Sequence, residues 1–158
     1  VMKLDPKFKV ENGKLFFLDG KEFDSTKAQK IDAADFIKNQ GLTDTEVPYA
    51  VLMPWSKVGL DEDSYDEDFL AKLRDVLKEF EEKNCYAIIV PVADRAAESA
   101  VQKENLTASM KHCARRIKDC ENVIGFSVPA EADQSFFIEE LSAKHKQYIF
   151  FSGDFKTL

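Results

Sequence analysis

Hydrophobic positions along this chain fall into two kinds of segment. Five short apolar runs are bounded by turn residues and predict strands: 13–20, 47–55, 85–92, 122–128 and 148–152. Four longer segments have apolar residues at three- and four-residue spacing and predict helices: 28–40, 65–83, 106–119 and 135–144. Residues 94–103 are polar and alanine-rich, which favours a loop with a short helix.

This alternation of strand and helix predicts parallel strands joined by right-handed crossovers, hence an α/β fold with a five-stranded, mainly parallel sheet. A length of 158 residues suits one domain, so we expect residues 1–158 to form a single α/β domain. Two strand orders fit the pattern. The order 1-2-3-4-5 gives a half-barrel with helices on one face, and 2-1-3-4-5 gives a flavodoxin-like doubly wound sheet.

Local signals place two of the helix ends. Residues 24–26, Asp-Ser-Thr, offer side-chain caps for the helix at 28–40, and Gly41 suits its C-cap. The acidic run at 61–68 lacks the spacing of an EF-hand loop. We therefore expect its carboxylates to lead into the helix at 65–83, where the helix dipole favours them.

Charge and cysteine content limit the partners and the compartment. The net charge of −7 repels phosphate backbones and anionic lipids, so neither nucleic acid nor a membrane is an expected partner. The three cysteines form no CxxC pair, and we expect buried free thiols, which favours a reducing compartment such as the cytoplasm. The chain begins with Val, which leaves a removed signal peptide open.

No metal or cofactor is expected. His112 and His145 lack a second histidine or a cysteine at ligand spacing. The sequence also contains no G-x-G-x-x-G motif and no P-loop, the two common phosphate-binding loops.

Four residues lie at or just after the carboxyl ends of predicted strands: Trp55, Asp94, Arg95 and Glu131. Parallel packing would bring them to one rim, where an aromatic face beside carboxylates and a guanidinium suits a weak carbohydrate site. Simpler roles compete. Trp55 also fits a partly buried rim aromatic, Asp94 and Arg95 a surface ion pair, and Glu131 an exposed loop acid.

Several stretches are similar to the N-terminal half of the (β/α)8 retaining glycoside hydrolases of the cellulase and β-mannanase type. They are Gly13–Gly20, Phe36–Leu42, Phe69–Asn84 and Arg115–Glu131, the last resembling a family stretch that ends in Asn-Glu-Pro. The resemblance implies a half-barrel with ligands at the carboxyl ends of its strands. It also implies that Glu131 occupies the position of the family's general acid/base.

The motif departs from the family's pattern at the active site. Ala130 and Ala132 replace the Asn and Pro beside the acid, Val51 replaces an Arg, and the third strand lacks a His. The family's nucleophile lies on a seventh strand, and retention needs two carboxyls roughly 5 Å apart. We therefore expect no self-sufficient glycosidase activity from five strands.

The resulting expectation is a degenerate or non-catalytic glycoside-hydrolase-like domain that binds carbohydrate or a protein partner at the carboxyl edge of its sheet. A homodimer is one such partnership, because an open sheet has edges to cover. Two alternatives remain: half of a glycosidase completed by another chain or segment, and an unrelated small doubly wound interaction domain.

Overall fold

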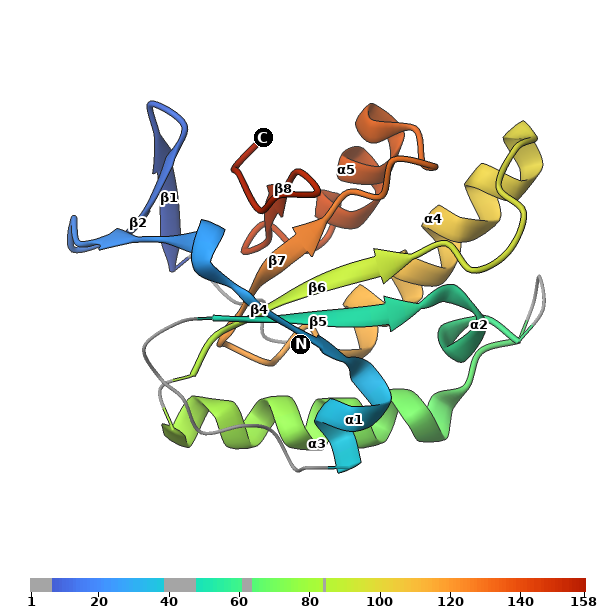
Figure 1. Cartoon of the computed structure of the whole chain (residues 1–158), viewed down its shortest axis with the longest axis horizontal. Coiled ribbons are helices and arrows are strands. Elements are labelled where there is room, and N and C mark those ends of the chain that lie inside the picture. The colour runs from blue at the N-terminus through green and yellow to red at the C-terminus, as the bar shows by residue number, and fades with distance from the viewer. Residues whose placement is uncertain (1–6, 39–47, 61–63, 84) are drawn as a thin grey trace.

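The computed structural model describes residues 7–38, 48–60, 64–83 and 85–158. Its main sheet contains five parallel strands in sequence order: β4 (Gln29–Asp32), β5 (Tyr49–Pro54), β6 (Ala87–Val92), β7 (Val123–Ser127) and β8 (Ile149–Phe151) (Figure 1). This order confirms the predicted α/β half-barrel and excludes the doubly wound alternative, whose strand order would reverse.

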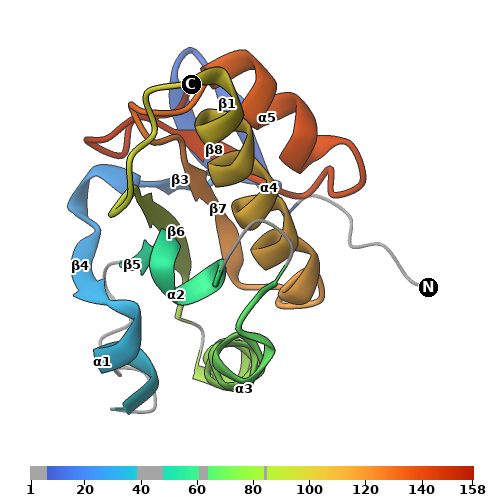
Figure 2. The same cartoon turned by 90° about the vertical axis from the view of Figure 1, so that its right-hand side faces the viewer.

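Five α-helices lie in the described part of the chain: α1 (Ala33–Lys38), α2 (Trp55–Val58), α3 (Glu67–Lys83), α4 (Ala100–Arg116) and α5 (Gln134–Ser142). Figure 2 looks onto the carboxyl ends of the strands, which form an arc with α3, α4 and α5 on its outer side. Within that described part, no helix is both long enough and apolar enough to cross a membrane.

Successive side chains along each strand point to opposite faces of the sheet, so the core consists of two clusters, one on each face. On the convex face Tyr49, Val51 and Met53 pack with apolar residues of every helix. On the concave face Ala50 and Ile88 belong to a second cluster that contains no helical residue. The prediction that helices cover mainly one face is therefore confirmed.

A small antiparallel sheet closes the amino-terminal end of the concave face. It consists of β1 (Phe8–Glu11), β2 (Lys14–Phe17) and β3 (Glu22–Phe23). Asn12 and Gly13 form the β1–β2 turn with φ angles of 52° and 76°, as an Asn-Gly hairpin turn requires. Three rings of this sheet and the ring of the residue before β6 pack edge to face or tilted, with centroids 5.0–5.7 Å apart: Phe8, Phe17, Phe23 and Tyr86.

The identity of the first parallel strand was predicted wrongly. The apolar run at 13–20 contains β2 of the antiparallel sheet, and the parallel sheet begins within the predicted helix at 28–40. Residues 29–32 pair with β5, and Asp32 accepts a hydrogen bond from the Ala34 amide, so α1 begins only at Ala33. Pairing with a buried neighbour strand outweighs the weak helical pattern of a largely polar segment.

Two other helix starts also differ from expectation. Asp24 caps a single turn of 3-10 helix, 25–27, and not the predicted longer helix. Helix α4 begins at residue 100, because Ser99 and Gln102 form a capping box ahead of its polar first turn. The predicted start at 106 marks only where its apolar face begins.

The acidic run behaves as predicted where it is described, since Glu67 and Asp68 lie in the first turn of α3. Residues 61–63 and the expected C-cap at Gly41 lie outside the described residues. All three cysteines are buried thiols and no disulfide joins them, as predicted.

Residues 152–158 fold back along the outer edge of β8. Phe151 and Thr157 form an antiparallel bridge, and the Leu158 amide donates to the Phe150 carbonyl at 3.1 Å. Phe155 is buried in the concave-face cluster and has a φ of 62°. This segment covers both the strand edge and part of the concave face.

Candidate binding site at the carboxyl edge of the sheet

Trp55 begins α2 immediately after β5, and its side chain is buried. Only 5% of it is exposed, and its indole N–H donates to the Ser109 hydroxyl of α4 at 3.0 Å. Gly59 ends α2 so close to this pair that a Cβ there would lie 2.6 Å from the Ser109 hydroxyl oxygen. The tryptophan therefore joins the β5 exit to α4.

Asp94 joins the exits of β5 and β6. Its carboxylate accepts from the Ser56 amide at 2.9 Å and from the Ser56 hydroxyl. Both carboxylate oxygens are thus held by the first turn of α2. This contact fixes the loop after β6 against the helix that follows β5.

Arg95 lies over Trp55. Its guanidinium donates to the Gly59 carbonyl, and its Cζ is 5.4 Å from the centroid of the Trp55 ring, within the range of a cation–π contact. No ion pair between Asp94 and Arg95 occurs among those the described residues make, so the two neighbours have separate partners.

The structure therefore brings three of the four predicted residues into one cluster. In it, Trp55 is covered by Arg95 and α4, and the polar groups of Asp94 and Arg95 are used internally. The arrangement is a rigid junction. A sugar would have to approach its outer surface, because the indole is enclosed.

Glu131 shares no hydrogen bond or ion pair with this cluster in the described part of the chain. It is exposed in the turn after β7, where the Ala132 amide donates to the Pro129 carbonyl at 3.1 Å. Within the described ranges no hydrogen bond or ion pair involves its carboxylate, and its neighbours Ala130 and Ala132 offer none.

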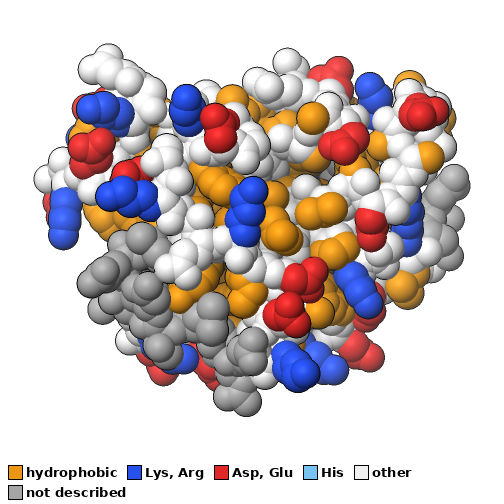
Figure 3. All heavy atoms as spheres, in the orientation of Figure 1, with side chains coloured by type: hydrophobic (Ala, Val, Ile, Leu, Met, Phe, Trp, Pro, Cys, Tyr) orange, Lys and Arg blue, Asp and Glu red, His pale blue; other side chains and the backbone are white. Residues whose placement is uncertain are grey.

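The concave face beside the rim is apolar. Leu52 of β5 and Val90 of β6 are partly buried, and Val92 is 37% exposed. They alternate with the buried convex-face residues and so lie on the concave side. Figure 3 shows hydrophobic side chains gathered in the middle of this face. At these strand ends the sheet presents hydrocarbon and few polar groups.

Sequence reasoning missed the residues that organise the cluster: Ser56, Gly59 and Ser109. Ser109 is 3% exposed and shares the buried side of α4 with Leu106 and Met110. A serine at an apolar helical position indicates a buried polar partner. That pattern is readable in the sequence, although the partner is not.

A second polar cluster, also missed, connects α3 and α4. The His112 ring stacks on Tyr65 with centroids 4.0 Å apart and an interplanar angle of 11°. His112 Nε2 donates to Glu67 at 2.6 Å, and Arg116 lies 4.0 Å from the same carboxylate. The hydrogen bond from His112 and the nearby positive charges lower the pKa of Glu67.

No group of three or more His, Cys, Asp or Glu side chains suited to a metal ion occurs in the described ranges.

Comparison with known proteins gives a fold but no sequence family. No protein-family model matches the chain, and no curated protein matches it. Among solved structures, a variant of a GH5_18 protein from Bifidobacterium longum subsp. longum in complex with Manb1-4GlcNAc matches with a TM-score of 0.52 and 9% identity. The match covers 77% of this chain and 38% of that one.

A GH5_18 from Bifidobacterium longum subsp. infantis is similar at a TM-score of 0.51 and 12% identity, over 76% of this chain and 37% of that chain. The chain therefore spans less than two fifths of the length of these structures. It has the fold of part of a GH5-type glycoside hydrolase barrel.

Proposed function

We propose that this chain is a glycoside-hydrolase-like domain that does not hydrolyse glycosides alone and that binds a protein partner through the concave face and carboxyl edge of its sheet. The observation that carries the proposal is the apolar surface at the strand ends, formed by Leu52, Val90 and Val92. A catalytic site needs polar groups there, whereas a protein interface needs a hydrophobic centre.

The state of the polar rim residues supports the absence of catalysis. Retention requires an acid and a nucleophile roughly 5 Å apart, with supporting hydrogen bonds to the sugar. Glu131 has alanines on both sides, and the carboxylate of Asp94 is held by Ser56. A lone exposed glutamate lacks the second carboxylate of that mechanism.

Hydrolysis assays test this part of the proposal. We expect no turnover of aryl β-glycosides, soluble β-glucans or β-mannans above the rate of a buffer blank, and no difference between the wild-type protein and Glu131→Gln. Turnover by the wild type that disappears in Glu131→Gln would instead support an active site completed by another chain.

The partner that fits the surface most simply is a second copy of the chain, since pairing two concave faces buries both. Light scattering across a concentration series tests this association. We expect Val92→Lys to weaken it, because a charge would have to be buried. The matched control is Val101→Lys on α4, a helix on the convex side of the sheet, where the native side chain is 60% exposed. A monomer at all concentrations, or equal effects of both variants, would contradict self-association.

Carbohydrate is the second candidate ligand, favoured by one observation: a fold neighbour was solved with Manb1-4GlcNAc. On this chain such a ligand would contact Glu131 and the outer surface of Asp94 and Arg95, with buried Trp55 holding Arg95 in place. NMR titration with cello- and manno-oligosaccharides tests it. Shifts at these rim residues that are lost in Glu131→Gln would support the site, and unchanged spectra at millimolar sugar would eliminate it.

A further inference from the structure

A groove of about 640 Å³ lies on the helical side of the molecule, away from the carboxyl-edge cluster. Residues of α3, the last turn of α4 and the turn that follows it line this groove. Its walls hold four cationic and two acidic side chains: Arg74, Arg115, Arg116, Lys118, Asp75 and Asp119. The excess of positive charge is notable in a chain with a net charge of −7.

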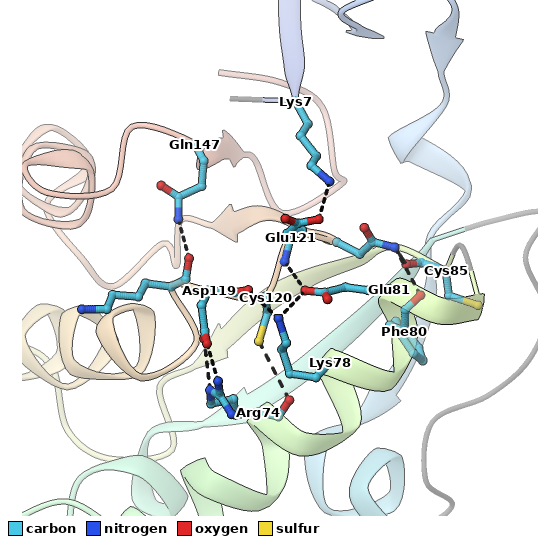
Figure 4. Close-up of polar contacts among 12 residues, drawn as sticks. Lys7, Arg74, Lys78, Phe80, Glu81, Cys85, Asp119, Cys120, Glu121 and Gln147 are labelled. Atoms are coloured by element: carbon cyan, nitrogen blue, oxygen red, sulfur yellow. Dashed lines mark hydrogen bonds and ion pairs between the residues drawn. The ribbon is translucent and has the colours of Figure 1, made fainter. Parts of the chain in front are cut away.

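One wall of the groove is a neutralised and rigid pair. The Arg74 guanidinium makes two hydrogen bonds to Asp119, one of them 3.0 Å long, as Figure 4 shows. That contact lowers the pKa of Asp119, so its carboxylate stays ionised and matches the charge of Arg74.

The turn that bears Lys118 is held from two further sides. The Lys78 ammonium donates to the Asp119 carbonyl and the Gln147 amide donates to the Lys118 carbonyl, each at 3.0 Å. Figure 4 shows Gln147 and Lys78 reaching this turn from different elements. The backbone under the groove is therefore fixed before any ligand arrives, which reduces the entropy cost of binding.

The remaining cations are available. Among the described residues, Arg115 and Lys118 make no side-chain hydrogen bond or ion pair, and Arg116 is 4.0 Å from Glu67, at the limit of an ion pair. Ala71 adds only a methyl group to the lining. Two unpaired cations thus face a concavity within the size range of small-molecule sites, which is roughly 300–1,000 Å³.

We propose that this groove binds a small ligand carrying a phosphate or diphosphate group, held by Arg115 and Lys118 with Arg116 beside them. Guanidinium groups match phosphate oxygens in two-pronged hydrogen bonds, and a lysine adds a point charge. Asp75, which is exposed in the lining, suits a hydroxyl group on the same ligand. The concave shape favours a small molecule over an extended macromolecular surface.

A competing explanation is that the cations only stabilise the C-terminus of α4. Basic residues in a last turn interact favourably with the helix dipole. That explanation predicts a loss of stability when they are replaced and no response to phosphate compounds. The two explanations therefore differ in a direct binding measurement.

The experiment is an NMR titration of the full chain with inorganic pyrophosphate, with ionic strength held constant by chloride. We expect saturable shifts in residues 71–75 and 115–119, and a dissociation constant raised tenfold or more in Arg115→Gln/Lys118→Gln, since charged hydrogen bonds of this strength are lost. The charge-matched control is Lys14→Gln/Lys144→Gln, both exposed outside the groove, which should bind pyrophosphate like the wild type.

A second variant, Ala71→Leu, narrows the groove without changing its charge and should also weaken binding. Adding ADP and glucose 6-phosphate as separate arms distinguishes a nucleotide from a sugar phosphate as the source of the anion. The proposal is overturned if pyrophosphate causes no saturable shifts, or if both charge variants weaken the response equally. A stability loss in Arg115→Gln/Lys118→Gln without pyrophosphate binding in the wild type would leave only the helix-dipole role.

Discussion

Packing on each face of the sheet depends on one residue in a sterically restricted position. Gly59 permits the contact between Trp55 and Ser109 on the convex side. Phe155 adopts a left-handed φ of 62° so that its ring can enter the concave-face cluster, while its carbonyl accepts from the buried Ser25 hydroxyl at 2.7 Å. The missing Cβ of Gly59 and the left-handed backbone of Phe155 each allow residues far apart in the sequence to pack together.

Replacing Gly59 with alanine should destabilise the protein. The new Cβ would lie 2.6 Å from the Ser109 hydroxyl oxygen, so the Trp55–Ser109 hydrogen bond must shift or break. A buried donor left without its acceptor costs about 1–3 kcal/mol, which urea denaturation should detect as a lower midpoint. Gly153→Ala is the control, because nothing lies within 4 Å of a Cβ there. Equal stability of the two variants would contradict the tight contact.

At Phe155, glycine should be less harmful than alanine. Both substitutions remove the same ring, at a cost of roughly 3–5 kcal/mol for a fully packed one. Alanine also keeps the left-handed strain, whereas glycine relieves it and should recover about 0.5–1 kcal/mol. The measurement is the free energy of unfolding of the two variants in urea. Greater stability of Phe155→Ala would show that the backbone relaxes out of the left-handed region.

Helices α3 and α4 are linked by polar contacts whose strength depends on pH. Glu67 has a lowered pKa, caused first by the hydrogen bond from His112 and then by the charges of His112 and Arg116. Because the folded-state pKa lies below the unfolded value, this contribution is present above about pH 4.5 and is lost as pH falls through the lowered pKa.

Glu67→Gln should therefore be less stable than wild type near neutral pH and approach it in acid. The difference should stay below about 1 kcal/mol, because the Glu67 side chain is 53% exposed and solvent screens it. Thermal unfolding between pH 3 and 7 measures this convergence. Glu79→Gln, an exposed position on the same helix, should show a flat difference across the series.

The helices and strands with the strongest periodic pattern of apolar residues were those predicted most accurately from the sequence. Helix α3 and strands β5–β7 were predicted closely, because α3 is strongly amphipathic and the strands are buried on both faces. Strand β4 was missed because its four residues are largely polar and its only partner in the sheet is β5. Whether this segment forms a strand depends on pairing with residues 20 positions later in the chain, and local propensity does not include that pairing.

At the scale of the whole molecule, the three cysteines report on global unfolding. All are buried, and burial raises the pKa of Cys113 and Cys120 to about 12. We expect none to react with a thiol reagent at pH 8 in the native protein and all three to react in urea, because the thiolate is the reactive form. An engineered exposed thiol, Ser135→Cys, should label at once. Rapid labelling of a native cysteine would reveal local opening of the core.

The sequence alone determined the α/β class, four of the five parallel strands (β5 to β8) and the residues that follow them. These features are encoded locally. The spacing of apolar residues shows which side of a helix or strand is buried, and turn residues mark where the element ends. It also indicated Trp55, Asp94, Arg95 and Glu131 as residues at one end of the sheet, because parallel strands share a carboxyl edge.

Only the tertiary structure decided the strand order, the segment that supplies the first parallel strand and the partners of the rim residues. Strand order excludes the doubly wound fold, and it depends on contacts between residues far apart in the chain. The same holds for Trp55, whose indole is buried because Ser109, 54 residues later, lies on the facing side of α4. Such contacts follow from how elements pack, and a pattern read along the chain describes only the elements themselves.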